Sequence, residues 1–147
     1  MGTLDFILVQ SDNEFEEFIK LYKKWQESSM KGSDVEKFKQ DIFQDNAIIT
    51  ILLAQHNKIS IWFTILIDSY STTLLSKTYY LEEFFIDVDY RRQWYWKKIF
   101  CYLQEFSKKN NRARIEWSTH ENNTAARNFY QGFGVEEDWI FYKMNFK

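Results

Sequence analysis

The spacing of apolar residues along the chain predicts a series of strands and helices. A short apolar run at residues 4–9 is typical of a strand. Apolar residues then recur at helical intervals from Ser11 to just before Ser28, and again from Ser33 to Ile42, so we expect two helices there. Ser11 and Glu14 have the spacing of a capping box, which favours a helix start at that point.

The period changes to that of strands in the middle of the chain. Residues 47–54 and 59–67 are predicted strands on either side of a polar turn, and residues 77–86 form a third. Farther along, the pattern predicts a helix over residues 90–108, a strand over 114–118, a helix over 123–133 and a last strand over 139–146.

The order of these elements predicts the class of fold. Three consecutive strands favour antiparallel pairing, whereas the strand, helix and strand around residues 80–118 favour one right-handed parallel crossover. We therefore expect an α/β protein with a mixed, mostly antiparallel sheet and helices on both faces, in a single domain over residues 1–147. A ligand would lie at the carboxyl ends of the parallel strands.

Composition changes the picture in two respects. The chain has 14 Phe, 9 Tyr and 6 Trp but only 4 Gly and no Pro. We therefore expect its turns to use Asn, Asp and Ser, which tolerate a left-handed backbone better than other residues with side chains. A net charge of −2 argues against nucleic acid or an anionic membrane as the partner.

Few residues indicate a compartment or a metal site. No apolar run reaches the ~18 residues of a membrane span. The single Cys101 excludes an intrachain disulfide, so we expect a soluble cytoplasmic protein. His56 and His120 are isolated from other ligand types in the sequence, and we expect no metal site.

Two carboxylates, Glu82 and Glu83, lie within the third predicted strand. Because strand side chains alternate, Glu82 should share a face with Phe84. Glu83 should lie on the opposite face with Leu81 and Phe85. If helices cover both faces, burial would raise the pKa of one carboxyl group toward that of a usable general base. An edge strand with both acids in water is the alternative interpretation.

A second group of candidate residues precedes and enters the helix predicted over residues 123–133. The order there is a strand end, a polar loop and a helix, so Asn123 or Thr124 could cap the helix. Tyr130 lies on the apolar stripe of this helix with Ala126 and Phe133. A tyrosine in that position is more often a core residue than a catalyst.

Three stretches together resemble the GNAT acetyltransferase superfamily. They are "YYLEEFFIDVDYR" at residues 79–91, "NNTAARNFY" at 122–130 and "EEDWIFYKM" at 136–144. The nearest likeness is to spermidine/spermine acetyltransferase and its diamine and thialysine acetyltransferase relatives. The order of elements extends the resemblance over nearly the whole chain, and it implies the GNAT fold.

The resemblance also implies a reaction and a site. A small amine would attack the thioester of acetyl-CoA, with Glu82 as general base and Tyr130 as general acid for the departing thiolate. Proteins of this kind are homodimers, so a homodimer is expected. The positions that would contact the cofactor are Phe84, Phe85, Ile86, Arg91, Arg92, Gln93, Trp94, Tyr95, Trp96, Lys97 and Asn123.

The sequence departs from the family's pattern in the loop that binds the cofactor's pyrophosphate. Arg92, Trp94 and Trp96 stand where the family has small residues, which let the phosphates approach the amide N–H groups of a helix start. In one hypothesis the indoles pack into the cleft or the core and the site no longer binds the cofactor. In the other, Arg91, Arg92, Lys97 and Lys98 hold the phosphates, and the tryptophans stack on adenine or face solvent.

Two functions therefore follow from the sequence. The first is a catalytically impaired or non-catalytic GNAT-like protein that acts through binding, with a protein among its potential partners. The alternative is an active acetyl-CoA-dependent N-acetyltransferase acting on a small primary amine through Glu82 and Tyr130.

Overall fold

The computed structural model describes residues 3–26, 32–91, 93–138 and 140–146. The contacts of the chain divide it into two compact units, Met1–Trp117 and Ser118–Lys147.

The described part of the first unit contains a five-stranded sheet in the order β1-β2-β3-β4-β5. Neighbouring strands from β1 to β4 are antiparallel, and β5 is parallel to β4. The predicted mixed sheet is therefore confirmed. The elements are β1 (Leu4–Leu8), α1 (Asp12–Gln26), α2 (Gly32–Phe43), β2 (Ile49–His56), β3 (Ile59–Ser71), β4 (Ser76–Ile86), the 3-10 turn η1 (Val88–Tyr90), α3 (Gln93–Lys109) and β5 (Ile115–Glu116).

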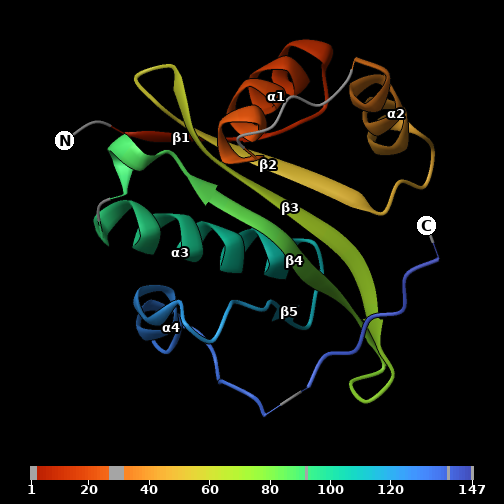
Figure 1. Cartoon of the computed structure of the whole chain (residues 1–147), viewed down its shortest axis with the longest axis vertical. Helices are drawn as coiled ribbons and strands as arrows, with labels where there is room; N and C mark the ends of the chain where they lie inside the picture. The colour runs from red at the N-terminus through yellow and green to blue at the C-terminus, as the bar shows by residue number, and fades with distance from the viewer. Residues whose placement is uncertain (1–2, 27–31, 92, 139, 147) are drawn as a thin grey trace. The chain divides into compact units, whose positions relative to one another are not determined.

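Helices cover both faces of this sheet, as predicted: α1 and α2 lie on one face and α3 on the other (Figure 1). Alternating residues of the central strands therefore enter two separate cores. The core under α1 and α2 includes Phe15, Phe18, Ile51, Leu53 and Phe63. The core under α3 includes Leu52, Trp62, Leu66, Ile99 and Leu103.

The start of α1 follows the sequence prediction, whereas the turns follow it only in part, because Lys58 and Leu75 have positive φ as well as Asn46, Asn57 and Asn111. The Ser11 N–H donates to Glu14 Oε2 at 3.0 Å, and the Glu14 N–H donates to Ser11 Oγ at 3.4 Å, which completes the capping box. In the turn between β2 and β3, Asn57 and Lys58 have φ of 51° and 65°. Positive φ at both central residues is the type I′ geometry of a tight hairpin, achieved here without glycine.

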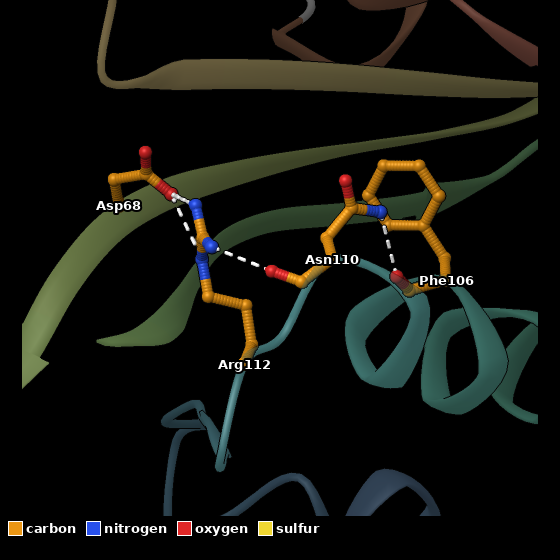
Figure 2. Close-up of polar contacts among 4 residues, drawn as sticks. All are labelled: Asp68, Phe106, Asn110 and Arg112. Atoms are coloured by element: carbon orange, nitrogen blue, oxygen red, sulfur yellow. Dashed lines mark hydrogen bonds and ion pairs between the residues drawn. The ribbon is translucent and has the colours of Figure 1, made fainter. Parts of the chain in front are cut away.

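The loop that leads from α3 to β5 is held by Arg112 (Figure 2). Its Nη2 and Nε atoms donate to Asp68 Oδ1 of β3 at 2.6 and 3.2 Å, and Nη1 donates to the Asn110 carbonyl oxygen at 2.7 Å. The guanidinium also lies 4.6 Å from the centre of the Tyr79 ring. These contacts fix the point from which β5 runs parallel to β4.

Two element boundaries around the crossover differ from the prediction. The helix expected from residue 90 begins at Gln93, because η1 ends at Tyr90 and the next residue, Arg91, has a ψ of 56°, which is not helical. The strand expected over residues 114–118 contains only Ile115 and Glu116, since β4 and β5 pair only at these residues.

The second unit contains α4 (Thr124–Tyr130), which is shorter than the predicted helix over residues 123–133. The last predicted strand, over residues 139–146, is wrong: residues 140–146 contain no strand, and Trp139 lies outside the described residues. An apolar, β-prone segment becomes a strand only by pairing with another strand. No such pairing involves residues 140–146 within the described part of the chain.

Candidate functional site

The strand β4 contains a β-bulge at Glu82. In the β3–β4 ladder Ile65 pairs with Glu83 and the next residue of β3 pairs with Leu81, so Glu82 has no partner. The extra residue reverses the alternation of side chains beyond it. Leu81 accordingly belongs to the core under α3, whereas Phe85 packs against the core under α1 and α2. The prediction that Leu81 and Phe85 share a face is therefore wrong.

The two carboxylates at the bulge have different surroundings. Glu82 is exposed, whereas Glu83 is half-buried. Burial, together with the negative charge of Glu82, raises the pKa of Glu83 to about 7. The expectation of one poorly solvated carboxylate is confirmed, but the residue is Glu83. A carboxyl group with such a pKa can exchange protons at neutral pH.

Tyr22 of α1 lies close to Glu83. Burial raises the pKa of Tyr22, and the charge of Glu83 raises it further. The Tyr22 ring packs 5.4 Å from Trp25 and 5.7 Å from Phe63, which in turn lies 5.7 Å from Phe85. Carboxylates beside aromatic rings form an environment that suits an organic cation, through ion pairing and the negative faces of the rings.

The edge of β4 next to Glu82 extends beyond β5. Because β5 pairs with only two residues of β4, residues 81–86 have no strand partner on this edge within the described chain. The Asp87 N–H donates to the Ile61 carbonyl oxygen of β3 at 2.8 Å. Backbone groups of an antiparallel strand alternate in direction, so the polar groups of Ile86 and Phe84 point to the free edge.

Arg91 occupies part of this free edge. Its Nε atom donates to the Ile86 carbonyl oxygen at 2.9 Å, and its guanidinium lies 5.6 Å from the centre of the Phe85 ring. The Nε atom of Arg91 is thus bonded to the end of β4 and is not available to a phosphate in this arrangement.

The side chain of Trp96 covers Phe84 next to the same edge. The two rings stack with their centroids 5.1 Å apart and an angle of 28° between their planes. Phe100 lies 5.1 Å from Phe84 on the same face, and Trp117 lies 5.9 Å from Phe100. These rings pack against one another beside the core under α3.

The side chain of Trp94 also packs against the core under α3. Its ring stacks on that of Tyr95 at 3.7 Å, and Lys98 Nζ lies 5.0 Å from the centre of the indole. Lys97 is exposed. Arg92 and the side chain of Gln93, both expected to contact the cofactor, lie outside the described residues.

These contacts test whether acetyl-CoA, the cofactor implied by the resemblance, fits the edge of β4. It requires free backbone groups on the edge and small side chains at the start of α3, where amide N–H groups would hold its phosphates. Arg91 already occupies the Ile86 carbonyl oxygen, and Trp96 covers Phe84. The residues present do not fit the cofactor in this arrangement.

Asn123 and Tyr130 lie in the second unit. Asn123 caps α4, because its Oδ1 atom accepts a hydrogen bond from the Ala126 N–H at 3.3 Å. Tyr130 is the last residue of α4, and burial raises the pKa of its hydroxyl. The role of Asn123 as a helix cap is confirmed, whereas the predicted roles of both residues toward a cofactor stay predictions.

The end of β4 is tied to α1 by an ion pair. Asp87 is only 6% exposed, and its Oδ2 atom lies 2.8 Å from Lys24 Nζ. The hydrogen bond to Asp87, and then the negative charge of Asp87, raise the pKa of Lys24. The pair holds the last turn of α1 beside the strand that carries Glu83.

The described residues hold neither a cluster of metal ligands nor a membrane span. No group of three or more His, Cys, Asp or Glu side chains lies close enough to bind one ion. None of the helices in the described ranges is both long and apolar enough to cross a bilayer.

Several solved structures resemble the chain. A ribosomal-protein-alanine N-acetyltransferase from Brucella melitensis biovar Abortus 2308 has 15% identity and a TM-score of 0.78, covering 99% of this chain and 100% of that one. The aminoglycoside acetyltransferase meta-AAC0020, from an uncultured soil metagenomic sample and in complex with sisomicin, has 16% identity and a TM-score of 0.81, covering 98% and 97%.

AAC(6')-Iy in complex with a bisubstrate analogue, CoA-S-monomethyl-acetylneamine, has 18% identity and a TM-score of 0.79, covering 98% of this chain and 99% of that one. At such identities the likeness shows the fold alone. No curated protein sequence matches the chain. The sequence does match the Acetyltransferase (GNAT) family over residues 15–135, which is most of its length, and the chain therefore belongs to the GNAT family.

Proposed function

We propose that this GNAT-family protein binds a small amine cation beside Glu82 and Glu83 and acts through binding, with its capacity for acetyl transfer reduced or lost. The observation that carries the proposal is the ring of Trp96 stacked on Phe84 at the free edge of β4. The bond from Arg91 to the Ile86 carbonyl oxygen supports it, since both contacts occupy space that a cofactor arm would need.

The chemistry around the bulge supports an amine as the ligand. Glu82 is exposed and Glu83 half-buried, and the second carboxylate lies beside Tyr22. An ammonium group bound beside these side chains would pair with the carboxylate charge and face aromatic rings. The names of two similar structures mention aminoglycosides or an acetylated neamine, which are compounds with several amino groups. A diamine or polyamine, as the sequence suggested, is the ligand class we propose.

An active N-acetyltransferase is the second candidate, and the pKa of Glu83 favours it. An ammonium must lose a proton before its nitrogen can attack an acyl group, and a carboxylate with a pKa of about 7 can accept that proton. In this candidate function Glu83 joins Glu82 as a candidate base, and Tyr130 remains the proposed acid. The cofactor would then have to displace Trp96 and Arg91.

Calorimetric titrations with spermidine and, separately, with acetyl-CoA test the two functions. The proposal expects saturable heat with spermidine and none with acetyl-CoA up to millimolar concentration. Glu83→Gln should weaken spermidine binding by about ten- to a hundredfold, because a charged partner contributes about 1.5–3 kcal/mol. Glu105→Gln, which removes a carboxylate at the far end of α3, is the matched control and should leave the affinity unchanged.

The outcomes separate the candidates. Micromolar binding of acetyl-CoA followed by acetylated amine in a turnover assay would replace the proposal with the active enzyme. Absence of spermidine binding by the folded protein would contradict the proposed ligand class. The homodimer and the cytoplasmic location remain part of the proposal, and light scattering of the purified protein tests the first of them.

A further inference from the structure

An open cavity of about 430 Å³ lies between the edge strand β1 and the helix α3. Its lining consists of Thr3, Leu4, Phe6, Lys97, Lys98 and Cys101. None of these residues belongs to the bulge or to the free edge of β4. The cavity is therefore distinct from the proposed amine site.

The floor of the cavity is apolar and held in place by packing. Leu4 and Phe6 are half-buried and point from β1 to the face covered by α3. The Phe6 ring stacks on Tyr102 with centroids 3.9 Å apart and planes within 7°, and it meets Trp62 edge to face at 6.2 Å. A ring fixed on two sides presents its remaining surface to the cavity.

The rim of the cavity is positively charged. Lys97 and Lys98 are exposed, and neither forms an ion pair with a carboxylate in the described part of the chain. Glu105, farther along α3, pairs with Lys108 at 3.1 Å. Asp5 lies on β1 between two floor residues, so the alternation of the strand directs it to the opposite face. Both lysines line the cavity without an ion-paired carboxylate in the described chain, and Lys98 Nζ lies 5.0 Å from the centre of the Trp94 ring.

We propose that this cavity binds a small anionic amphiphile, an aliphatic monocarboxylate, with its chain on Leu4 and Phe6 and its carboxylate beside Lys97 and Lys98. Apolar sites with a few convergent charges are the usual form of small-molecule pockets. An inorganic anion would leave the apolar floor uncovered, and a neutral lipid would leave the ammonium groups without a counter-charge. The apolar floor and the charged rim together select a ligand that has both an apolar chain and an anionic group.

The thiol of Cys101 provides a direct readout, because it is the single cysteine of the chain, is exposed and lines the cavity. The rate of its alkylation by iodoacetamide, an uncharged reagent, is measured with increasing decanoate below the concentration at which micelles form. The expected result is a saturable fall in rate of at least about fivefold, since a bound chain excludes the reagent. Decanol, which lacks the charge, and acetate, which lacks the chain, should protect much less.

A pair of double variants tests the charged rim. Lys97→Gln with Lys98→Gln should raise the decanoate concentration for half-maximal protection by about two- to thirtyfold, because exposed ion pairs contribute up to about fivefold each. Lys108→Gln with Lys109→Gln removes the same charge from the other end of α3 and should leave protection unchanged. The ratio of rates with and without decanoate is compared within each variant, which cancels any effect of the lysines on the thiol itself.

Three results would overturn the proposal. The first is unchanged alkylation of the folded wild-type protein throughout the decanoate titration. The second is equal protection by decanol, which would show that the charge has no role. The third is full protection in the Lys97→Gln and Lys98→Gln variant, which would place the ligand elsewhere.

Discussion

The ring of Trp96 lies over that of Phe84, with the centroids 5.1 Å apart. Phe84 belongs to the part of β4 that β5 leaves unpaired in the described chain. The contact joins Trp96, a position where the resemblance led us to expect a small residue, to Phe84, a strand position that the resemblance led us to expect beside the cofactor. Whether a ligand can reach this edge therefore depends on the Trp96 side chain, which a substitution can remove.

Replacing both indoles should open the edge. Trp94→Gly with Trp96→Gly should give measurable affinity for acetyl-CoA in a calorimetric titration, because the amide groups at the start of α3 and the edge of β4 become accessible. The free energy of unfolding should fall by about 1–3 kcal/mol for the lost packing, with up to about 1 kcal/mol more for each glycine in the helix. Trp94→Gly alone, which leaves Trp96 on Phe84, should gain little. A folded double variant without affinity would show that the indoles are not what excludes the cofactor.

Glu83 should make the protein less stable as the pH rises through 7. Its pKa is about 7 in the folded protein against an ordinary value of 4.5, so the folded state holds the proton more tightly. The contribution of Glu83 to stability is then fully present below pH 4.5 and is lost as the pH rises through 7. Because the side chain is partly exposed, we expect a loss of only about 1–2 kcal/mol.

Urea denaturation at pH 5 and pH 8 measures this effect. The Glu83→Gln variant has no proton to lose and should show a smaller fall between the two pH values than the wild type. Glu14→Gln is an informative comparison, because hydrogen bonds, first that from the Gln10 N–H, lower the pKa of Glu14 and give its contribution the opposite sign. Equal pH dependence of the wild type and Glu83→Gln would contradict the raised pKa.

The Arg112 contact should contribute strongly to stability (Figure 2). Arg112→Met removes three hydrogen bonds, two of them to the Asp68 carboxylate, and should lower the free energy of unfolding by about 1–3 kcal/mol. A double-mutant cycle with Asp68→Asn should give a coupling of about 1 kcal/mol or more. The exposed pair Lys108–Glu105 serves as the control and should couple by less than about 0.5 kcal/mol. Similar couplings for the two pairs would argue against a structural role for Arg112.

The Lys24–Asp87 pair should stabilise the junction of α1 and β4. Lys24→Met leaves the buried Asp87 carboxylate without its cation and should cost about 1–3 kcal/mol in chemical denaturation. Adding Asp87→Asn should recover part of the loss, because the remaining side chain is neutral. A double variant less stable than Lys24→Met would show that Asp87 has a second structural partner.

The sequence predicted those parts of the fold that depend on local pattern. The helical stripe of α1, its capping box at Ser11 and Glu14, and the antiparallel strands all follow from residue spacing, and the structure contains them. The last strand failed because its formation depends on a partner strand, which a local pattern does not reveal.

The site was predicted less completely, and the bulge is the reason. Alternation assigned Glu82 and Glu83 to faces as though the strand were regular, but the ladder with β3 skips Glu82. The raised pKa of Glu83 depends on the packing beyond that irregularity. The orientation of Trp96 toward Phe84 likewise depends on the distance between α3 and β4, which a sequence of aromatic residues does not specify.

The unpaired position of Glu82 also affects how β4 can change by insertion or deletion. The core under α3 contains Tyr79 and Leu81 from before the bulge and Ile86 from after it. The side chains on this face are thus odd-numbered before the bulge and even-numbered after it. Deleting Glu82 would restore the simple two-residue period and keep each of these side chains on its present face. Deleting a neighbouring residue as well as Glu82 would move the side chains of one half of the strand to the opposite face of the sheet. The carboxylate at the bulge is thus a residue that the sheet itself does not require, and its position can be gained or lost without rebuilding either core.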